Sequence, residues 1–127
     1  MDFDKVQSIV KKVLKDIDYS AIYLFGSYAN GDFTEDSDID IGLLLRREIE
    51  PLLRIELQDT LETELKKEVD LVTLNLEEDG NYLLLGSIIK GCLIDSKEDI
   101  IDYLYRTFKI DEIEFCEYLM FGDEINE

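Results

Sequence analysis

The segment Gly26–Leu45 has the sequence GSYANGDFTEDSDIDIGLLL, and it places two acids where a strand should bury apolar side chains. Asp38 and Asp40 alternate with Ile39 and Ile41. Because side chains alternate between the two faces of a strand, the carboxylates share one face, roughly 6.5–7 Å apart, and the isoleucines share the other. Two carboxylates on one partly shielded face repel each other unless a cation lies between them. The pattern therefore predicts a strand with one apolar face and one ion-binding face.

A third acid occurs in a similar apolar setting. Asp70 lies within EVDLVTLN, a predicted strand over 68–75. If this strand is a neighbour of the one that carries Asp38 and Asp40, the three carboxylates form a cluster. Mg²⁺ accepts oxygen ligands of this kind and usually keeps water and substrate phosphates at its remaining positions. The cluster is typical of metal-dependent phosphoryl or nucleotidyl transfer, in which Asp70 could also accept the proton of an attacking hydroxyl.

An apolar run also precedes the acidic pair. The run AIYLF at 21–25 predicts a strand that ends at Gly26. Glycine allows backbone amides to approach a ligand closely, and if Ser27 begins a short helix, its amides point at an anion such as a triphosphate. A Gly-Ser pair after a strand is more often an ordinary turn, so this feature carries weight only in combination with the acids.

The remaining chain alternates helices with short strands, which indicates a small sheet with helices packed on it, an α/β or α+β fold. Its length of 127 residues suits one domain. Residues 97–127 form a predicted C-terminal helical extension, rich in aromatics, that either covers the sheet or docks a partner. The sequence leaves the strand order open. The other predicted elements are helices over 3–16, 51–67 and 81–90 and strands over 38–44 and 92–95.

The amino-acid composition excludes several classes of function. The chain has 13 basic and 31 acidic side chains, a net charge of −18, so we expect no nucleic acid partner. It has no apolar run long enough to span a bilayer and no signal-peptide pattern, so we expect no membrane association and a cytoplasmic location. The absence of histidine excludes Ser-His-Asp catalysis and leaves carboxylates as the candidate general bases. Cys92 and Cys116 form no CxxC pair and are expected to be small buried hydrophobes.

The glycine turn and the Asp-x-Asp strand together resemble the signature of the DNA polymerase beta-like nucleotidyltransferase superfamily, and the short chain is similar to its minimal nucleotidyltransferase (MNT) branch. The resemblance covers roughly residues 5–95. It implies a mixed β-sheet with flanking helices, Asp38, Asp40 and Asp70 as catalytic ligands of Mg²⁺, and the nucleotide phosphates near the turn. The residues that carry the signature or are implied to contact the nucleotide are Gly26, Ser27, Asn30, Gly31 and Ser37–Ile41.

The resemblance also implies a function. Members of the MNT branch commonly act as antitoxins that transfer AMP from ATP to a tyrosine of a HEPN-domain toxin encoded beside them. By this resemblance the chain is a Mg²⁺-dependent nucleotidyltransferase with ATP as substrate and a cognate HEPN-type toxin as partner. Two alternatives stay open: an antitoxin that neutralises its partner by binding with little or no catalysis, and a transferase acting on a small molecule such as an aminoglycoside.

One feature departs from the family pattern. Many relatives carry basic residues at the positions occupied here by Tyr28 and Asn30. Asn30 can hydrogen-bond a phosphate but cannot neutralise it, so the metal would have to neutralise more of the negative charge in the transition state. Arg46, Arg47 and Lys67 are candidate compensating cations, although such side chains are more often solvated surface charges.

Overall fold

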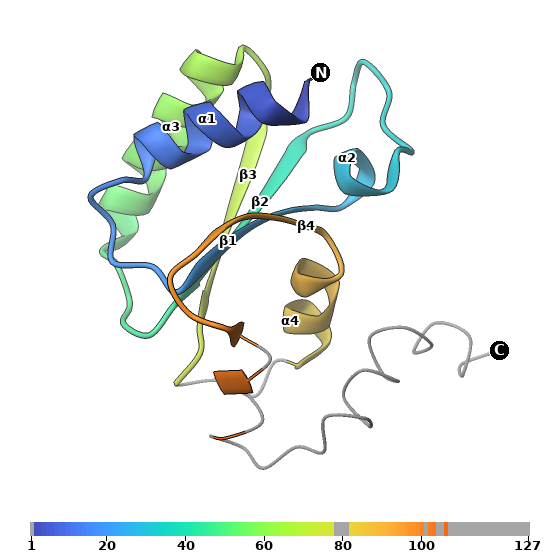
Figure 1. Ribbon diagram of the computed structural model, residues 1–127. Helices are drawn as coiled ribbons and strands as arrows, with labels where there is room; N and C mark the ends of the chain where they lie inside the picture. The colour runs from blue at the N-terminus through green and yellow to red at the C-terminus, as the bar shows by residue number, and fades with distance from the viewer. Residues whose placement is uncertain (1, 78–81, 101, 104–105, 107–127) are drawn as a thin grey trace, which may run out of the picture.

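The computed structural model describes residues 2–77, 82–100, 102–103 and 106 (Figure 1). The strands and the longer helices expected for this part of the chain are present, with their ends shifted by a few residues at most. The elements are α1 (Phe3–Val13), β1 (Ala21–Phe25), α2 (Ser27–Asn30), β2 (Ile39–Leu45), α3 (Pro51–Leu65), β3 (Val69–Asn75), α4 (Tyr82–Ile89) and β4 (Cys92–Ser96).

The four strands form one sheet in the order β3-β2-β1-β4. Strand β1 is antiparallel to both β2 and β4, whereas β2 and β3 are parallel. A short link suffices for the antiparallel pair, while the parallel pair needs a longer crossover, and α3 lies in that connection. The predicted mixed sheet with flanking helices is therefore confirmed, and β3 and β4 are its edges.

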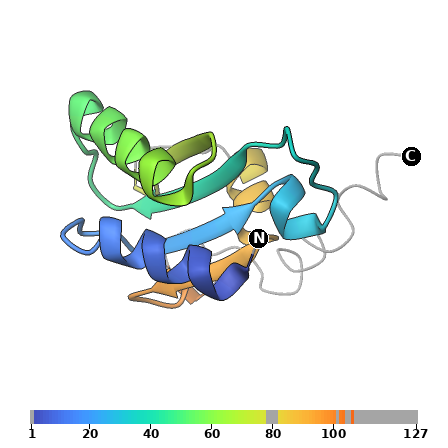
Figure 2. The ribbon, with the colours of Figure 1, turned by 90° about the horizontal axis from the view of Figure 1, so that it is seen from above.

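Helices cover the two faces of the sheet unequally. Figures 1 and 2 show α1 and α3 together on one face and α4 on the other. Ile39 and Ile41 are fully buried in the core beneath α1 and α3, as the alternation predicts. Gly42 projects toward Ile88 of α4, where an added Cβ would lie 2.6 Å from the Ile88 side chain. By the same alternation Asp40 lies on the α4 face.

The end of α3 brings the chain to the acidic end of the sheet. Pro51 occupies the first turn of α3, where its missing N–H is tolerated. Lys66 ends the helix in the left-handed conformation, with φ of 56°. This turn leads directly into β3, so Lys67 and Glu68 lie beside the start of β2, where the Ile39 amide donates a hydrogen bond to the Glu68 carbonyl oxygen (2.9 Å).

The predicted extension over 97–127 lies mostly outside the described residues, as does Cys116. Within the described part the extension begins as a helical turn, since the Tyr103 amide donates to the Asp99 carbonyl (2.9 Å). Cys92 is a free, half-buried thiol. No helix that can be searched in the described ranges combines the length and apolarity needed to cross a membrane.

Candidate active site

Asp40 and Asp70 are direct neighbours across the parallel strands β2 and β3. The two Cα positions pair in the sheet register, so both side chains project from the α4 face, about 4.8 Å apart along the hydrogen-bonding direction. Asp40 is half-buried and Asp70 is exposed. Asp38 comes just before β2 and is exposed. The predicted cluster depended on the two acid-bearing strands being neighbours, and β2 and β3 are neighbours.

The three carboxylates influence one another electrostatically. Burial is the largest cause that raises the pKa of Asp40, and the negative charges of Asp70 and then Asp38 raise it further. Mutual repulsion of this kind favours either a shared proton or a bound cation. A cation bound among these carboxylates would relieve the repulsion.

Glu68 is a fourth acid at this site that the sequence analysis missed. A hydrogen bond to Asp38 raises the pKa of Glu68, and the negative charge of Asp38 adds to the effect. The sequence did contain a signal, because Glu68-Val69-Asp70 repeats the acid–apolar–acid pattern of the Asp38–Asp40 segment one strand away. Parallel pairing aligns the two repeats.

Gly26 forms the wall of the site behind Asp40. Its φ is +74°, and an added Cβ would lie 2.2 Å from Asp40 Oδ2. Only glycine tolerates both the left-handed φ and this approach. Helix α2 starts at Ser27, as the sequence analysis allowed, and the Asn30 amide donates to the Gly26 carbonyl (3.1 Å).

The loop between α2 and β2 is closed by its own hydrogen bonds. Gly31 ends α2 with φ of +79°. The Ser37 hydroxyl accepts a hydrogen bond from the Thr34 amide (2.8 Å), and the Ser37 amide donates to the Thr34 carbonyl (3.1 Å). The structure thus gives Ser37 a local role in shaping the approach to Asp38. Its predicted contact with a phosphate, like that of the exposed Asn30, stays a prediction.

Lys67 is the candidate cation that lies beside this loop. Its ammonium donates to the Glu35 carbonyl (2.6 Å) and lies 5.6 Å from the centre of the Tyr28 ring. That ring stacks on Phe33 with centroids 4.4 Å apart. Lys67 therefore links the start of β3 to the loop that follows the glycine turn.

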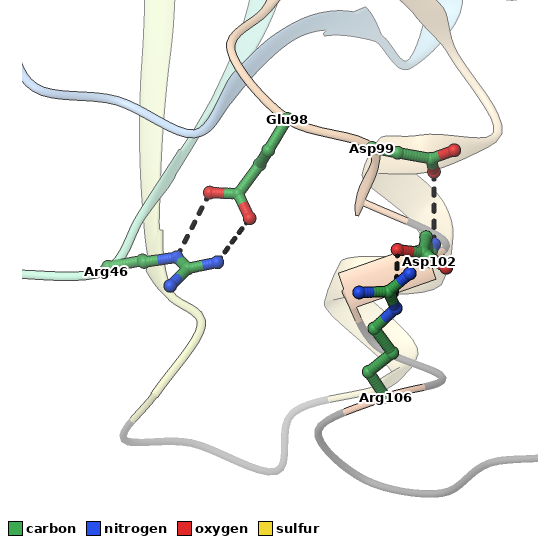
Figure 3. A network of polar contacts seen from close by, with 5 residues as sticks. All are labelled: Arg46, Glu98, Asp99, Asp102 and Arg106. Atoms are coloured by element: carbon green, nitrogen blue, oxygen red, sulfur yellow. Dashed lines mark hydrogen bonds and ion pairs between the residues drawn. The ribbon is translucent and has the colours of Figure 1, made fainter.

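The suggestion that Arg46 or Arg47 compensates for the missing basic residues is wrong. Both follow the opposite end of β2, about 20 Å from Asp40 at the usual rise per strand residue. Arg46 is also engaged there, since its Nε donates to Glu98 (3.0 Å) and its guanidinium lies 4.2 Å from the Tyr103 ring centre. Figure 3 shows this Arg46–Glu98 pair together with the Asp102–Arg106 pair.

A cavity of about 440 Å³ also lies at the far end of β2 and β3, between Leu45, Ile49, Arg54 and Thr73. None of the predicted site residues lines it. The carboxylates lie at the other end of these strands, where Asp38 and Asp70 are exposed and Asp40 is half-buried.

The donor set fits a hard divalent cation such as Mg²⁺. Asp38, Asp40 and Asp70 offer carboxylate oxygens alone, and burial, followed by the charges of Asp70 and Asp38, raises the pKa of Asp40. Across the part of the chain that the structure describes, no three acidic or cysteine side chains are gathered tightly enough to enclose a metal ion. A three-carboxylate metal site therefore requires these side chains to come closer together than they are here.

Comparison with known proteins agrees with this arrangement. The family described as polymerase beta, nucleotidyltransferase matches residues 5–100. The protein adenylyltransferase MntA of Shewanella oneidensis is 45% identical over 53 residues, which is 42% of this chain and 38% of that protein. The match thus spans well under half the length of that curated relative.

Two solved structures are similar over nearly the whole chain. A crystal structure of a toxin–antitoxin with AMP-PNP superposes with a TM-score of 0.66 at 26% identity, covering 95% of this chain and 98% of that one. A mutant of a toxin–antitoxin that includes MntA gives 0.64 at 25% identity, with coverage of 95% and 98%. The chain therefore belongs to the polymerase beta family of nucleotidyltransferases, and within it to the minimal nucleotidyltransferase branch.

Proposed function

We propose that this protein transfers AMP from ATP to a tyrosine hydroxyl of a cognate HEPN-type toxin and thereby acts as its antitoxin. The observation that carries the proposal is the pairing of Asp40 with Asp70 across β2 and β3, against Gly26. Support for the substrate comes from the similar protein named an adenylyltransferase and from the similar toxin–antitoxin solved with AMP-PNP.

In the proposed reaction the tyrosine oxygen attacks the α-phosphorus of ATP. The bond from that phosphorus to the bridging oxygen breaks, and pyrophosphate leaves with the electron pair. We assign acceptance of the hydroxyl proton to Asp70, because it is exposed and adjacent to Asp40.

The same carboxylates would hold the metal. Asp38, Asp40 and Asp70 are the proposed ligands of Mg²⁺, which when bound supplies positive charge to the phosphate oxygens. Gly26 and Ser27, with Asn30 and Ser37, are proposed to contact the triphosphate.

The test is incubation of the protein with Mg²⁺, ATP labelled at the α-phosphate, and the HEPN-domain protein encoded beside it. We expect label on the partner, and a loss of at least about 100-fold in the rate for D38N, D40N and D70N. The exposed α3 acid Asp59 supplies the control D59N, which should label at the parent rate. Full labelling by D40N would overturn the assignment.

Neutralisation by binding is the second candidate, and the uncharged Tyr28 and Asn30 favour it. If the protein acts by binding alone, it forms a stoichiometric complex with the toxin, and the D40N variant should neutralise the toxin as well as the parent does. An adenylyltransferase antitoxin loses neutralisation with the same substitution, so toxicity assays of D40N separate the two.

A further inference from the structure

Helix α3 turns a polar stripe toward the edge strand β3. Arg54, Gln58 and Glu62 follow one another at intervals of four residues, so they lie on one face of the helix. All three are half-buried. A helix that only covers a sheet would place apolar side chains at such positions.

The stripe hydrogen-bonds the backbone of β3. The Val69 amide donates to Glu62 Oε2 and the Leu71 amide to Gln58 Oε1, each at 3.0 Å. Arg54 donates to the Leu71 carbonyl oxygen at 3.4 Å. Successive residues of a strand direct their N–H and C=O groups to opposite sides. The Glu68 carbonyl accepts a hydrogen bond from the Ile39 amide of the β2 side, so the backbone groups of Val69 and Leu71 point away from β2.

The two amides flank Asp70 in the sequence. Among the described strands β3 pairs with β2 alone, and its other side is held by α3. Asp70 and Asp40 are direct neighbours across the strand pair, and two carboxylate charges at this spacing repel each other. The α3 side chains therefore fix the position of this edge strand from the side that faces away from β2.

We propose that Gln58 and Glu62 are positioning residues that hold Asp70 opposite Asp40 and so complete the metal site. Neither side chain touches the reacting groups. The part of this inference that concerns Mg²⁺ rests on the proposed function, whereas the restraint of β3 does not.

The chain offers a matched control on the opposite edge of the sheet. Gln7 of α1 donates to the Ile94 carbonyl of β4 at 2.8 Å. Q7A removes a helix-to-edge hydrogen bond from a strand that carries none of the predicted site residues. Q58E and E62Q are conservative variants that keep an oxygen acceptor facing β3.

The experiment measures two quantities on the full chain: backbone amide exchange at Val69 and Leu71, and Mg²⁺ affinity by calorimetry. We expect Q58A and E62A to speed exchange at their partner amides and to weaken Mg²⁺ binding by about tenfold. E62Q and Q58E should restore slow exchange, and Q7A should leave Mg²⁺ affinity at the parent value.

The outcomes separate this inference from the proposed function. If the parent binds Mg²⁺ and the single variants Q58A and E62A each bind it as tightly as the parent, the positioning role is overturned while the proposed function stands. Unchanged exchange at Val69 and Leu71 would also overturn it. If the parent itself binds no Mg²⁺, the proposed function fails, and faster exchange in E62A would still support the restraint of β3.

Discussion

At the scale of single residues, Gly26 and Asp40 constrain each other. The Asp40 carboxylate occupies the space that a side chain at position 26 would need. Gly31, five residues later, has a similar φ of +79°, but nothing lies within 4 Å of an added Cβ there. Because ψ is −151° at Gly26 and 6° at Gly31, the backbone strain of a side chain differs at the two positions, and Mg²⁺ affinity is the readout that reports displacement of the acid.

Alanine substitutions at these two glycines test this difference. G31A should lower the free energy of unfolding by about 1–2 kcal/mol, from the left-handed backbone alone. G26A should cost more and also weaken Mg²⁺ binding, because its methyl group displaces the Asp40 side chain. Urea denaturation and calorimetry measure the two effects, and equal Mg²⁺ affinity in both variants would contradict the prediction.

Residue-level patterns predicted part of the site. The alternation of Asp38 and Asp40 with isoleucines was sufficient to place both carboxylates on one face. Glu68 was overlooked because one more acid among 31 carries little information until the strand register is known. The rise per strand residue could already have excluded Arg46, which lies a full strand length from Asp40.

At the scale of elements, Tyr19 ties the connection between α1 and β1 to the edge strand β4. Its hydroxyl donates to the Asp95 carboxylate, and the Lys97 ammonium lies 4.2 Å from its ring centre. Burial, followed by the hydrogen bond to Asp95 and the charge of Asp95, raises the pKa of Tyr19 from 10.0 to about 12. The folded protein thus keeps this phenol neutral.

The raised pKa predicts a specific alkaline behaviour. Because the folded value exceeds the unfolded one, the stabilisation is complete below pH 10.0 and is lost as the pH rises through about 12. Y19F should cost about 1 kcal/mol near neutral pH, and its deficit relative to the parent should shrink over that alkaline window. Denaturant titrations at several pH values measure this, and a constant deficit would contradict it.

The elements themselves were predictable where local signals were strong. Pro51 marked the start of α3. Its end was predicted at residue 67, but the helix ends at Leu65, because Lys66 adopts the left-handed conformation and no glycine in the sequence signals that turn. Strand order was out of reach, since it depends on how α3 carries the chain from β2 to β3. The position of Asp70 followed from that order alone.

At the scale of the whole molecule, the net charge of −18 opposes compaction. The pairs that the structure does show, such as Lys12–Glu64 at 3.8 Å, are solvent-exposed and contribute little. We therefore expect self-repulsion to dominate the response to salt.

Adding NaCl should stabilise the fold. Between about 0.01 M and 1 M the Debye length falls from roughly 30 Å to 3 Å, and the free energy of unfolding should rise on the order of 1 kcal/mol. Urea denaturation across this range measures the change. A decrease with salt would mean that attractive ion pairs outweigh the repulsion.

The side chains of Gln58 and Glu62 along β3 have a consequence for self-association. An exposed edge strand is a template on which another extended chain can add, and many proteins blunt such edges with prolines, lysines or bulges. Here a helix of the same chain already occupies the amides of Val69 and Leu71. A foreign strand would have to displace those contacts first, so this stretch of the sheet is protected from aggregation by the same hydrogen bonds that orient it.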